Sequence, residues 1–508
     1  MVQNMTGPSK QDFIGTYGQA ITRLNTSPNE REFQHQAVLA LARSGSLDLA
    51  ISEYARYDLS SVRHHEDIMA LEGRLFKDLY IRALWRGDHA GAKSYAQQSA
   101  HKYEDAFQDT QGFYSGVNAA TMALMADMPE EIISARVKAI IELLPDAQQL
   151  TPEDHYFVEA TRAECTLMLG EQETAKRSLQ KARAFDPQNY AAHASTIKQF
   201  ELILDKQSKD KNWLADFRPP RPLHYAGHIW TDSHPVSDEL ALKISDFIQQ
   251  HDIGFAYGAL AAGADITFAE ALLQEGAELN VILPESIEDF LARSVEPYGA
   301  DWVSRFNACL EQAHSVTCLP EINDGEDYVR HGLAGHMAMG QAILRSEHLA
   351  VSACQLLILN PRRTGSLTAL HGKDWTEAGL SQHIINLGSE MKLGKPRNTT
   401  RQTIDVIGRT SSDKSAQKFD SFSHAMSVIL NSPKDKSAMW GLHFDLPGAE
   451  QELDIIISKN LAGSILVTEP IASYAALKHP NDYIITLAGT SPNIAQNPIR
   501  IYTLQPLV

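Results

Sequence analysis

The middle of the chain contains a turn whose residue types suit the binding of a phosphate group. The stretch GFAYGALAAGADITFAEALLQEGAELNVILP, residues 254–284, is typical of a strand, a glycine-bearing turn, a helix and a second strand. We predict that the turn covers 261–265 with Gly263 at its centre, and that Thr267 and Glu270 form a T-x-x-E capping box that opens the helix. Backbone N–H groups at a helix start and the helix dipole both favour an anion. This turn is therefore a candidate site for a phosphate.

A second loop with glycine and hydroxyl side chains follows another apolar strand. The run CQLLILNP precedes RRTGSLTALHGKDW, in which Arg362 and Arg363 offer cationic forks for a phosphate. Ligands on parallel sheets bind at the carboxyl ends of the strands, so both loops belong to the expected ligand edge. The candidate ligand-binding residues are those nearest the strand ends and in the two loops: Gly227, His228, Tyr257, Gly258, Gly263, Asp265, Glu270, Arg363, Thr364 and Gly365.

The same residues also have a structural interpretation. Most glycine turns between a strand and a helix only pack the helix on the sheet, and Asp265 is a common turn former. Glu270 then serves only as a cap partner, and the arginines are solvated surface residues. The sequence leaves both interpretations open.

Other catalytic and metal-binding patterns are absent from the sequence. His224 and His228 would share one face of a strand, but no third ligand is identifiable and H-E-x-x-H does not occur, so we expect no metal site. Neither a G-x-S-x-G elbow nor a G-x-x-x-x-G-K-[ST] loop occurs. No catalytic residue is assigned.

Composition limits the classes of partner. The chain has 508 residues, of which 63 are acidic and 45 are basic, which gives a formal net charge of −18. Nucleic acids and anionic membranes attract basic surfaces, so we expect neither bulk nucleic acid nor a membrane as partner. The four cysteines lack a C-x-x-C pair, the N-terminus lacks the apolar core of a signal peptide, and no run of about 18 apolar residues occurs. These features predict a cytoplasmic protein with free thiols.

The first part of the chain, residues 1–215, is expected to be an all-α helical repeat domain. In DHYFVEATRAECTLMLGEQETAKRSLQKARAFDPQNYAA, a glycine, two alanines and a proline follow the spacing of a tetratricopeptide repeat: Gly170, Ala175, Ala182 and Pro187. The alanines let two antiparallel helices approach, and the proline stops the second helix. About six helical hairpins of roughly 34 residues would fill this segment. Such a stack offers a concave surface for a protein partner. A non-repeat helical bundle is the alternative.

Two further domains are expected after the proline-rich linker at 218–222. Over 216–395, strands alternate with helices, which predicts an α/β domain with a Rossmann-like, doubly wound parallel sheet. Over 400–508, the order of strands and helices predicts an α+β domain. The fold class is therefore multidomain.

Three resemblances sharpen these expectations. HYAGHI, FAYGALAAGADITFAEALLQEGAELNVILP and QLLILN followed by RRTGSLTA resemble the SLOG class of Rossmann-like domains, whose members bind or hydrolyse nucleotides or nucleotide-derived ligands. The helical region with GFYSGVNAATMALM resembles the TRAFs-binding helical domain of stress-signalling and bacterial proteins. The segment from GSILVTEPIASYAAL to PIRIYTL resembles the end of class III nucleotidyl cyclase domains.

The chain departs from the enzymatic patterns of these families. Nucleotide-hydrolysing SLOG members carry PGGxGTxxE, whereas AAGADITFAE and PRRTGSLTAL lack the double glycine, and Leu370 stands where the second would need an acid. In the cyclase-like part, Asp405 lies near the first metal position, a second aspartate is absent, and Asn460 has no accompanying arginine. The resemblances therefore imply ligand binding rather than catalysis and a degenerate, inactive cyclase domain. Because cyclase folds commonly pair, they also imply a homodimer.

Three functions follow from the sequence. The favoured one is a signalling or regulatory protein, in prokaryotic stress or defence, that senses a nucleotide-derived ligand and binds a protein through its helices. The second is a nucleotide-processing enzyme in which Asp265 or Glu270 supplies the acid. The third is a scaffold without a ligand.

Overall fold

The computed structural model describes residues 12–145, 150–231, 238–320, 327–360, 366–387, 404–413, 415–431, 438–459, 461–491 and 498–507. Within these ranges the chain forms two compact units. The helical unit contains the described residues up to Pro219, together with Thr486–Thr490 and Leu507. The sheet unit contains the described residues of Pro220–Ile485 and Ser491–Pro506.

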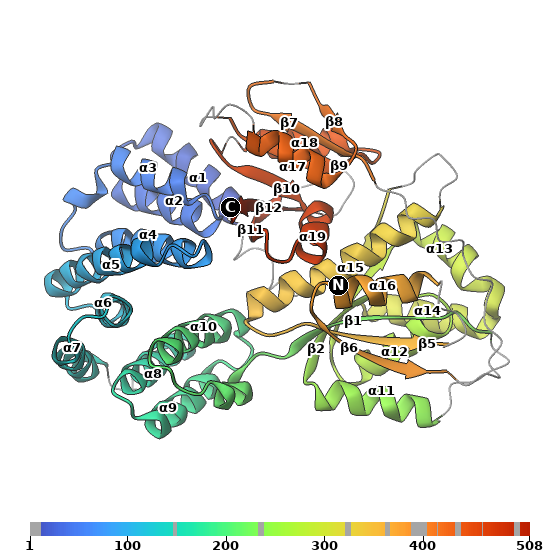
Figure 1. Ribbon diagram of the computed structural model, residues 1–508, viewed down its shortest axis with the longest axis horizontal. Coiled ribbons are helices and arrows are strands. Elements are labelled where there is room, and N and C mark those ends of the chain that lie inside the picture. The colour runs from blue at the N-terminus through green and yellow to red at the C-terminus, as the bar shows by residue number, and fades with distance from the viewer. Residues whose placement is uncertain are drawn as a thin grey trace. The chain divides into compact units, whose positions relative to one another are not determined.

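The helical unit is built from ten α-helices in its described part, coloured blue to green in Figure 1. These are α1 (Phe13–Thr26), α2 (Arg31–Arg43), α3 (Leu47–Arg56), α4 (Glu66–Trp85), α5 (His89–Thr110), α6 (Phe113–Met125), α7 (Glu130–Leu143), α8 (Pro152–Met168), α9 (Gln172–Phe185) and α10 (Tyr190–Lys206), with short 3-10 turns η2 (Leu59–Ser61) and η4 (Asn212–Phe217).

The small-residue spacing acts as predicted in this unit. Gly170 has φ +84° between α8 and α9, and Ala175 and Ala182 are fully buried where the two helices pack. In the residues that the structure describes, the ten helices make five pairs, one fewer than the predicted number of about six hairpins. The reason is helix length, since α4 and α5 have 20 and 22 residues, and the two helices together are longer than a 34-residue repeat.

The first sheet of the sheet unit has six parallel strands in the order β4-β3-β2-β1-β5-β6. Its elements are β1 (Arg221–Gly227), α11 (Asp238–Gln250), β2 (Ile253–Gly258), α12 (Ala264–Gln274), β3 (Glu278–Leu283), α13 (Ile287–Ser294), η5 (Glu296–Tyr298), α14 (Ala300–Gln312), β4 (Ser315–Cys318), α15 (Asp327–Leu349), β5 (Cys354–Leu359), α16 (Leu367–Glu377) and β6 (Ser381–Asn386).

The strand order places a topological switch point between β1 and β5. The chain winds outward from β1 to β4, returns through α15, and then winds the other way through β5 and β6. Because crossovers between parallel strands are right-handed, this reversal puts α15 and α16 on the face opposite α11 and α12. Figure 1 shows α15 and α11 on opposite sides of the strands.

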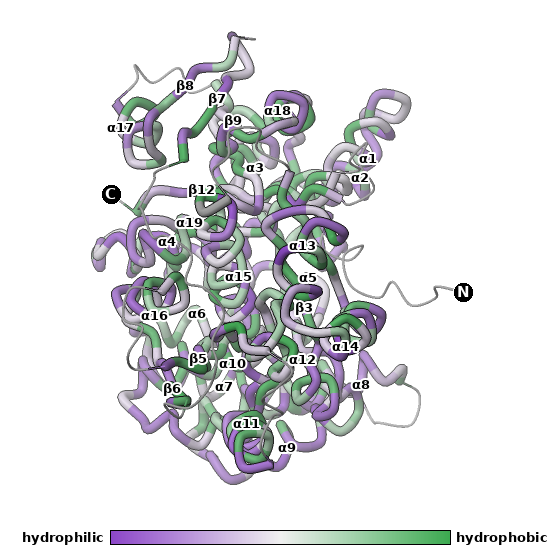
Figure 2. Tube along the Cα trace, turned by 90° about the vertical axis from the view of Figure 1, so that its right-hand side faces the viewer, coloured by the Kyte–Doolittle hydropathy of each residue, from purple (hydrophilic) through white to green (hydrophobic). Residues whose placement is uncertain are grey.

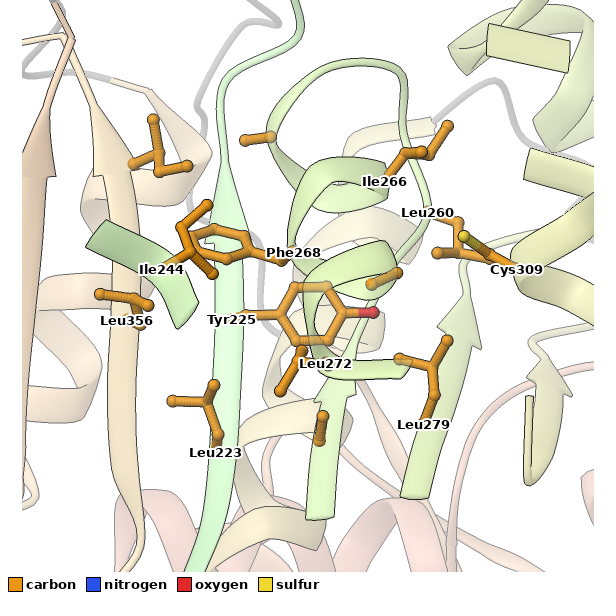
Figure 3. Close-up of a cluster of buried hydrophobic side chains, with 14 of the residues drawn as sticks. Leu223, Tyr225, Ile244, Leu260, Ile266, Phe268, Leu272, Leu279, Cys309 and Leu356 are labelled. Carbon is orange, nitrogen blue, oxygen red and sulfur yellow. The ribbon is translucent and has the colours of Figure 1, made fainter. Parts of the chain in front are cut away.

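The core of this sheet lies mainly between the strands and the helices of the α12 face. Tyr225 of β1 is fully buried, and its ring lies 5.7 Å from that of Phe268 on α12 (Figure 3). The Tyr225 hydroxyl donates to the Ala259 carbonyl at 3.0 Å, which satisfies the polar end of this core ring. Helix α11 is amphipathic, with green and purple turns in Figure 2, and buries Leu240 and Ile244 in the same core.

The second sheet is mixed and has the order β11-β12-β10-β9-β7-β8. Its central strands β9 and β10 are parallel, while β7 and β12 pair with them in antiparallel fashion. The elements are β7 (Val406–Thr410), β8 (Gln417–Phe419), α17 (Phe422–Asn431), β9 (Trp440–Phe444), α18 (Ala449–Ile457), β10 (Ile465–Thr468), α19 (Glu469–Lys478), β11 (Tyr483–Ser491) and β12 (Ile499–Pro506). The predicted fold class is confirmed: a helical repeat part, a Rossmann-like parallel sheet and an α+β part.

Two local predictions are wrong. The proposed capping box does not form, because α12 begins at Ala264, and Thr267 instead donates its hydroxyl to the Gly263 carbonyl at 2.8 Å inside the first turn. The predicted linker over 218–222 is shorter than expected, because β1 already begins at Arg221 and includes Pro222. A register shift between these two residues lets the proline stand at the start of a central strand.

Candidate functional site

A cavity of about 170 Å³ lies at the carboxyl ends of β1, β2 and β3, where α15 and the start of α16 also reach it. This is the sheet edge at the topological switch point, the usual ligand position of doubly wound sheets. The lining residues that carry polar or aromatic side chains are His224, Tyr225, His228, Asp265, Phe290, Ser294, Tyr298, His331, Ser366, Thr368 and His371.

The structure gathers only part of the predicted ligand-binding set at this cavity. Gly227, His228, Gly258 and Asp265 line it. Three others, Tyr257, Gly263 and Glu270, do not belong to its wall. The last three, Arg363, Thr364 and Gly365, lie outside the described residues, as does Arg362.

Gly263 lies outside the cavity wall, at the sharp backbone turn that precedes α12. Its φ of 99° and ψ of −117° suit only glycine. A Cβ atom there would lie 2.7 Å from the Trp230 nitrogen and 2.9 Å from the His228 carbonyl oxygen. The glycine therefore lets α12 begin directly against the segment that follows β1.

Tyr257 and Glu270 have structural partners away from the cavity. Burial raises the pKa of Tyr257 to about 12, and Arg345 lies close enough to oppose this shift. Glu270 accepts two hydrogen bonds from the Arg305 guanidinium, at 2.8 and 2.6 Å. This bidentate pair joins α12 to α14 and leaves Glu270 without a role at the cavity.

Asp265 occupies one backbone amide of the turn that the sequence offered to an anion and one at the end of β1. Its carboxylate oxygens accept from the amide of Gly227 at 3.1 Å and from that of Ala261 at 3.3 Å. Asp265 is only 7% exposed, and burial raises the pKa of its carboxyl to about 7, although the two amides lower it in part. The first turn of α12 therefore carries the protein's own acid, and the cavity gains a carboxyl that exchanges its proton near neutral pH.

The N-terminus of α16 is the helix start at the cavity that carries no acid. Ser366 caps it by accepting from the Ala369 amide at 3.2 Å, and its first turn contains no acidic residue. Ser366, Leu367 and Thr368 all line the cavity. The Thr368 hydroxyl also donates to the Gly227 carbonyl at 3.3 Å, which ties the helix start to the end of β1. The positive end of the α16 dipole thus faces the cavity from the switch point.

His371, one turn into α16, is a buried cavity residue with an unsatisfied polar atom. It is 7% exposed and lines the cavity, and its Nε2 has no hydrogen-bond partner among the described residues. Burial, assisted by the neighbouring His336 and His224, holds the pKa of His371 well below its usual value, so the ring is neutral. Gly335 of α15 makes room for it, because a Cβ there would lie 2.0 Å from the ring. A neutral imidazole both donates and accepts, which suits a hydroxyl or a nucleobase edge.

His224 supports this wall from β1. Its Nδ1 accepts from the Gln355 amide at 2.9 Å, and its ring is stacked 5.9 Å from that of Trp375. Burial lowers the pKa of His224 to about 3, so this ring is neutral as well. The sequence favoured a core or loop position for His224 over a zinc site, which agrees with its burial, whereas His371 was not among the predicted site residues. The signal that could have indicated His371 is the position of this residue, about one helical turn after Ser366 in the loop already expected at the ligand edge.

No group of three or more histidine, cysteine or acidic side chains in the described ranges is arranged to hold a metal ion. Asp405, the position expected to resemble a cyclase metal ligand, is paired with Lys418 at 2.9 Å. The same ammonium lies 2.7 Å from Asp445, so a lysine bridges the two carboxylates. Across the described residues, no helix combines the length and the apolar character of a membrane span.

Comparisons with known proteins support the repeat assignment. Residues 14–123 match the family described as TPR-S, Tetratricopeptide Repeats-Sensor. No curated protein matches the chain.

Three solved structures resemble parts of the chain. A tetratricopeptide-repeat protein of Thermus thermophilus is 14% identical, with 37% of this chain and 91% of that chain covered and a TM-score of 0.30. A mutant O-GlcNAc transferase of Thermobaculum terrenum is 8% identical over 64% of this chain and 58% of its own, at a TM-score of 0.18. LpoA of Haemophilus influenzae is 11% identical over 76% of this chain and 70% of its own, at a TM-score of 0.14.

Proposed function

We propose that this chain is a signalling or regulatory protein that binds a nucleoside phosphate, or a fragment of one, at the switch point of its parallel sheet. The observation that carries the proposal is the cavity itself, where an acid-free helix N-terminus lies beside an unpartnered, buried histidine. A buried polar atom without a partner costs free energy, and a ligand that completes its hydrogen bond recovers that cost.

Each part of such a ligand has a complementary group in the wall. The phosphate would bind at the start of α16, where backbone amides and the Ser366 hydroxyl, which is still able to donate, meet the positive end of the dipole. His371 and Asp265 would bind ribose hydroxyls or the edge of the base, since a neutral imidazole and a carboxyl both hydrogen-bond to such groups. Phe290 and Tyr298 supply apolar and aromatic surface for the base.

The size of the cavity favours a small ligand. At roughly 10–15 Å³ for each water position, 170 Å³ holds about a dozen waters. A nucleoside monophosphate or a ribose phosphate suits this space better than a dinucleotide. The resemblance of this sheet to SLOG domains favours the same chemical class.

The remaining parts of the chain would transmit the signal. The TPR-S match over 14–123 supports protein binding by the helical unit, since tetratricopeptide helices commonly hold peptides or partner domains. We assign the mixed sheet a structural role, because its sequence resembles the end of cyclase domains and a lysine bridges Asp405, near the expected metal position, to Asp445. Since cyclase folds commonly pair, this part would also hold a homodimer together.

Isothermal titration tests the proposal with the full chain. The panel consists of nucleoside monophosphates, adenosine, ribose 5-phosphate, inorganic phosphate and cyclic dinucleotides. We expect a monophosphate to bind best and His371→Ala to weaken it at least tenfold. His314→Ala, which removes an exposed histidine of the same unit, is the control. The proposal fails if no panel member binds at millimolar concentration, or if His371→Ala binds as tightly as the wild type.

A second function has one specific observation in its favour. Asp265 is a buried acid in a cleft with a pKa near 7, which suits general acid–base work on a nucleotide. Base release from nucleoside monophosphates would then be lost in Asp265→Asn. It would be kept in Glu270→Gln, because the Glu270 carboxylate of the wild type binds Arg305 away from the cavity. Absence of base release by the wild type, with binding intact, would leave sensing as the function.

A further inference from the structure

The two helices that line the cavity from the α15 face also contact α19 of the second sheet. Helix α15 presents Ala334, Gly335 and Ala338 to the cavity, and α16 presents Ser366, Leu367 and His371. Both helices then continue to α19, which lies within the same compact unit. A change at the cavity wall therefore has a short physical route to the second sheet.

An ion pair between a buried carboxylate and a partly exposed lysine forms the first contact on this route. Asp374 of α16 follows His371 by three residues, about one helical turn, and its side chain is 6% exposed. Its Oδ1 lies 2.5 Å from the Lys478 Nζ of α19, and its Oδ2 lies 2.8 Å from the His336 Nε2 of α15. One carboxylate thus joins all three helices. His336 in turn lies beside His371, with 6.1 Å between ring centroids.

Close backbone packing forms the second contact. A Cβ atom on Gly340 of α15 would lie 2.2 Å from the Ser473 carbonyl oxygen of α19, so the two helices meet where no side chain intervenes. Tyr474, the next residue, packs its ring 5.9 Å from that of His336. Since packed helices without intervening side chains have little room to slide, a shift of α19 would move α15 as well.

We propose that ligand affinity at the cavity and the docking of α19 are coupled through the Lys478–Asp374 ion pair. This inference rests on the proposed function, because it assigns a regulation to the same site. With Lys478 in place, Asp374 holds α16 against α15 and fixes His371 toward the cavity. Without Lys478, the Asp374 carboxylate keeps its contact with His336 but loses its ammonium partner, and the less compensated charge draws α16 toward water. By linkage, a ligand held by α16 strengthens the docking of α19 by the same factor.

Hydrogen exchange on the full chain without ligand tests the coupling independently of binding. Lys478→Met should raise amide exchange in 366–377 at least tenfold. The control is Lys373→Met, which removes a neighbouring surface lysine of α16 that pairs with Glu377. This variant keeps Lys478, and amide exchange in α19 should match that of the wild type. Lys478→Arg keeps the charge and should restore the wild-type pattern. Unchanged exchange of 366–377 in Lys478→Met overturns the coupling.

The second arm uses adenosine monophosphate as the probe. In the wild type it should slow exchange in 469–478, and Lys478→Met should bind it at least fivefold more weakly than Lys373→Met does. Binding to both variants with equal affinity overturns the coupling while the proposed function stands. If adenosine monophosphate and the rest of the panel bind no form of the protein, the proposed function fails, and the ligand-free exchange result alone decides whether α19 docking controls α16. Should Lys478→Met not fold, the Asp374→Asn and Lys478→Arg pair provides the same comparison.

Discussion

Replacing Asp265 by asparagine should change how the stability of the sheet unit depends on pH. The side chain is buried, and its carboxyl pKa in the folded chain is about 7, against 3.8 for the group in water. Because the folded pKa is raised, the folded state holds a proton that the unfolded state releases between these two values. Stability contributed by this group is therefore fully present below pH 3.8 and falls as the pH rises toward 7.

The size of the effect follows from the length of that window. Each pH unit inside it lowers the free energy of unfolding by about 1.4 kcal/mol, so the wild type loses about 2–3 kcal/mol between pH 5 and pH 7 through this one residue. Asparagine has nearly the same shape and does not titrate. The stability difference between Asp265→Asn and the wild type should therefore move by the same 2–3 kcal/mol in favour of the variant over this range.

Urea unfolding at half-unit steps from pH 4.5 to 8 measures this difference. In a background with Trp85→Phe and Trp213→Phe, which removes the tryptophans of the helical unit, the fluorescence of the buried Trp230 and Trp302 reports on the sheet unit, in which Asp265 lies. Asp301→Asn removes an exposed carboxyl from the neighbouring helix α14 and should give a curve parallel to that of the wild type. If the Asp265→Asn curve is also parallel, within about 0.5 kcal/mol, the reasoning is refuted. The amides of Gly227 and Ala261 would then outweigh burial and keep Asp265 ionised at pH 5.

Three further outcomes test the packing around the cavity by urea unfolding of the same unit. Gly263→Ala should lower the free energy of unfolding by at least about 2–3 kcal/mol, because of backbone strain and collision with the chain after β1. Gly276→Ala, at positive φ but with open space around it, should lower it by about 1 kcal/mol. Equal losses in the two variants would contradict this account. Gly335→Ala should displace His371 and lower both stability and ligand affinity. Gly332→Ala, one turn away and with open space around it, should stabilise α15 by about 0.5–1 kcal/mol. Loss of ligand binding in both variants would count against a local effect. Tyr225→Phe should cost about 1–2 kcal/mol because a buried carbonyl loses its donor, and a neutral result would show that water replaces the hydroxyl.

The strand–helix alternation of the middle segment was readable because each element is decided by its own residues. Apolar runs bounded by glycine and proline gave β1, β2, β3 and β5 near their true positions. In the helical unit, Gly170, Ala175 and Ala182 were equally informative, since their small size is needed wherever two helices touch.

Local patterns failed where a side chain or amide in the motif bonded to a partner that the motif does not specify. Thr267 and Glu270 match a capping box, yet Glu270 binds Arg305, 35 residues away, and the helix begins earlier at Ala264. The glycine turn looked like a ready anion site, but the Asp265 carboxylate accepts from the Ala261 amide of that turn and from the Gly227 amide at the end of β1. Short motifs do not reveal which partner wins such a competition.

The sequence alone determined the class of each part and indicated the sheet edge that carries the candidate site, because periodicity and turn residues act over a few neighbours. The tertiary structure decided which side chains meet there. Helix α15 crosses back over the sheet, so that Gly335 makes room for His371 beside β1, more than a hundred residues from where that strand begins. Burial then sets the protonation of His371 and Asp265, and burial depends on contacts that no local pattern records.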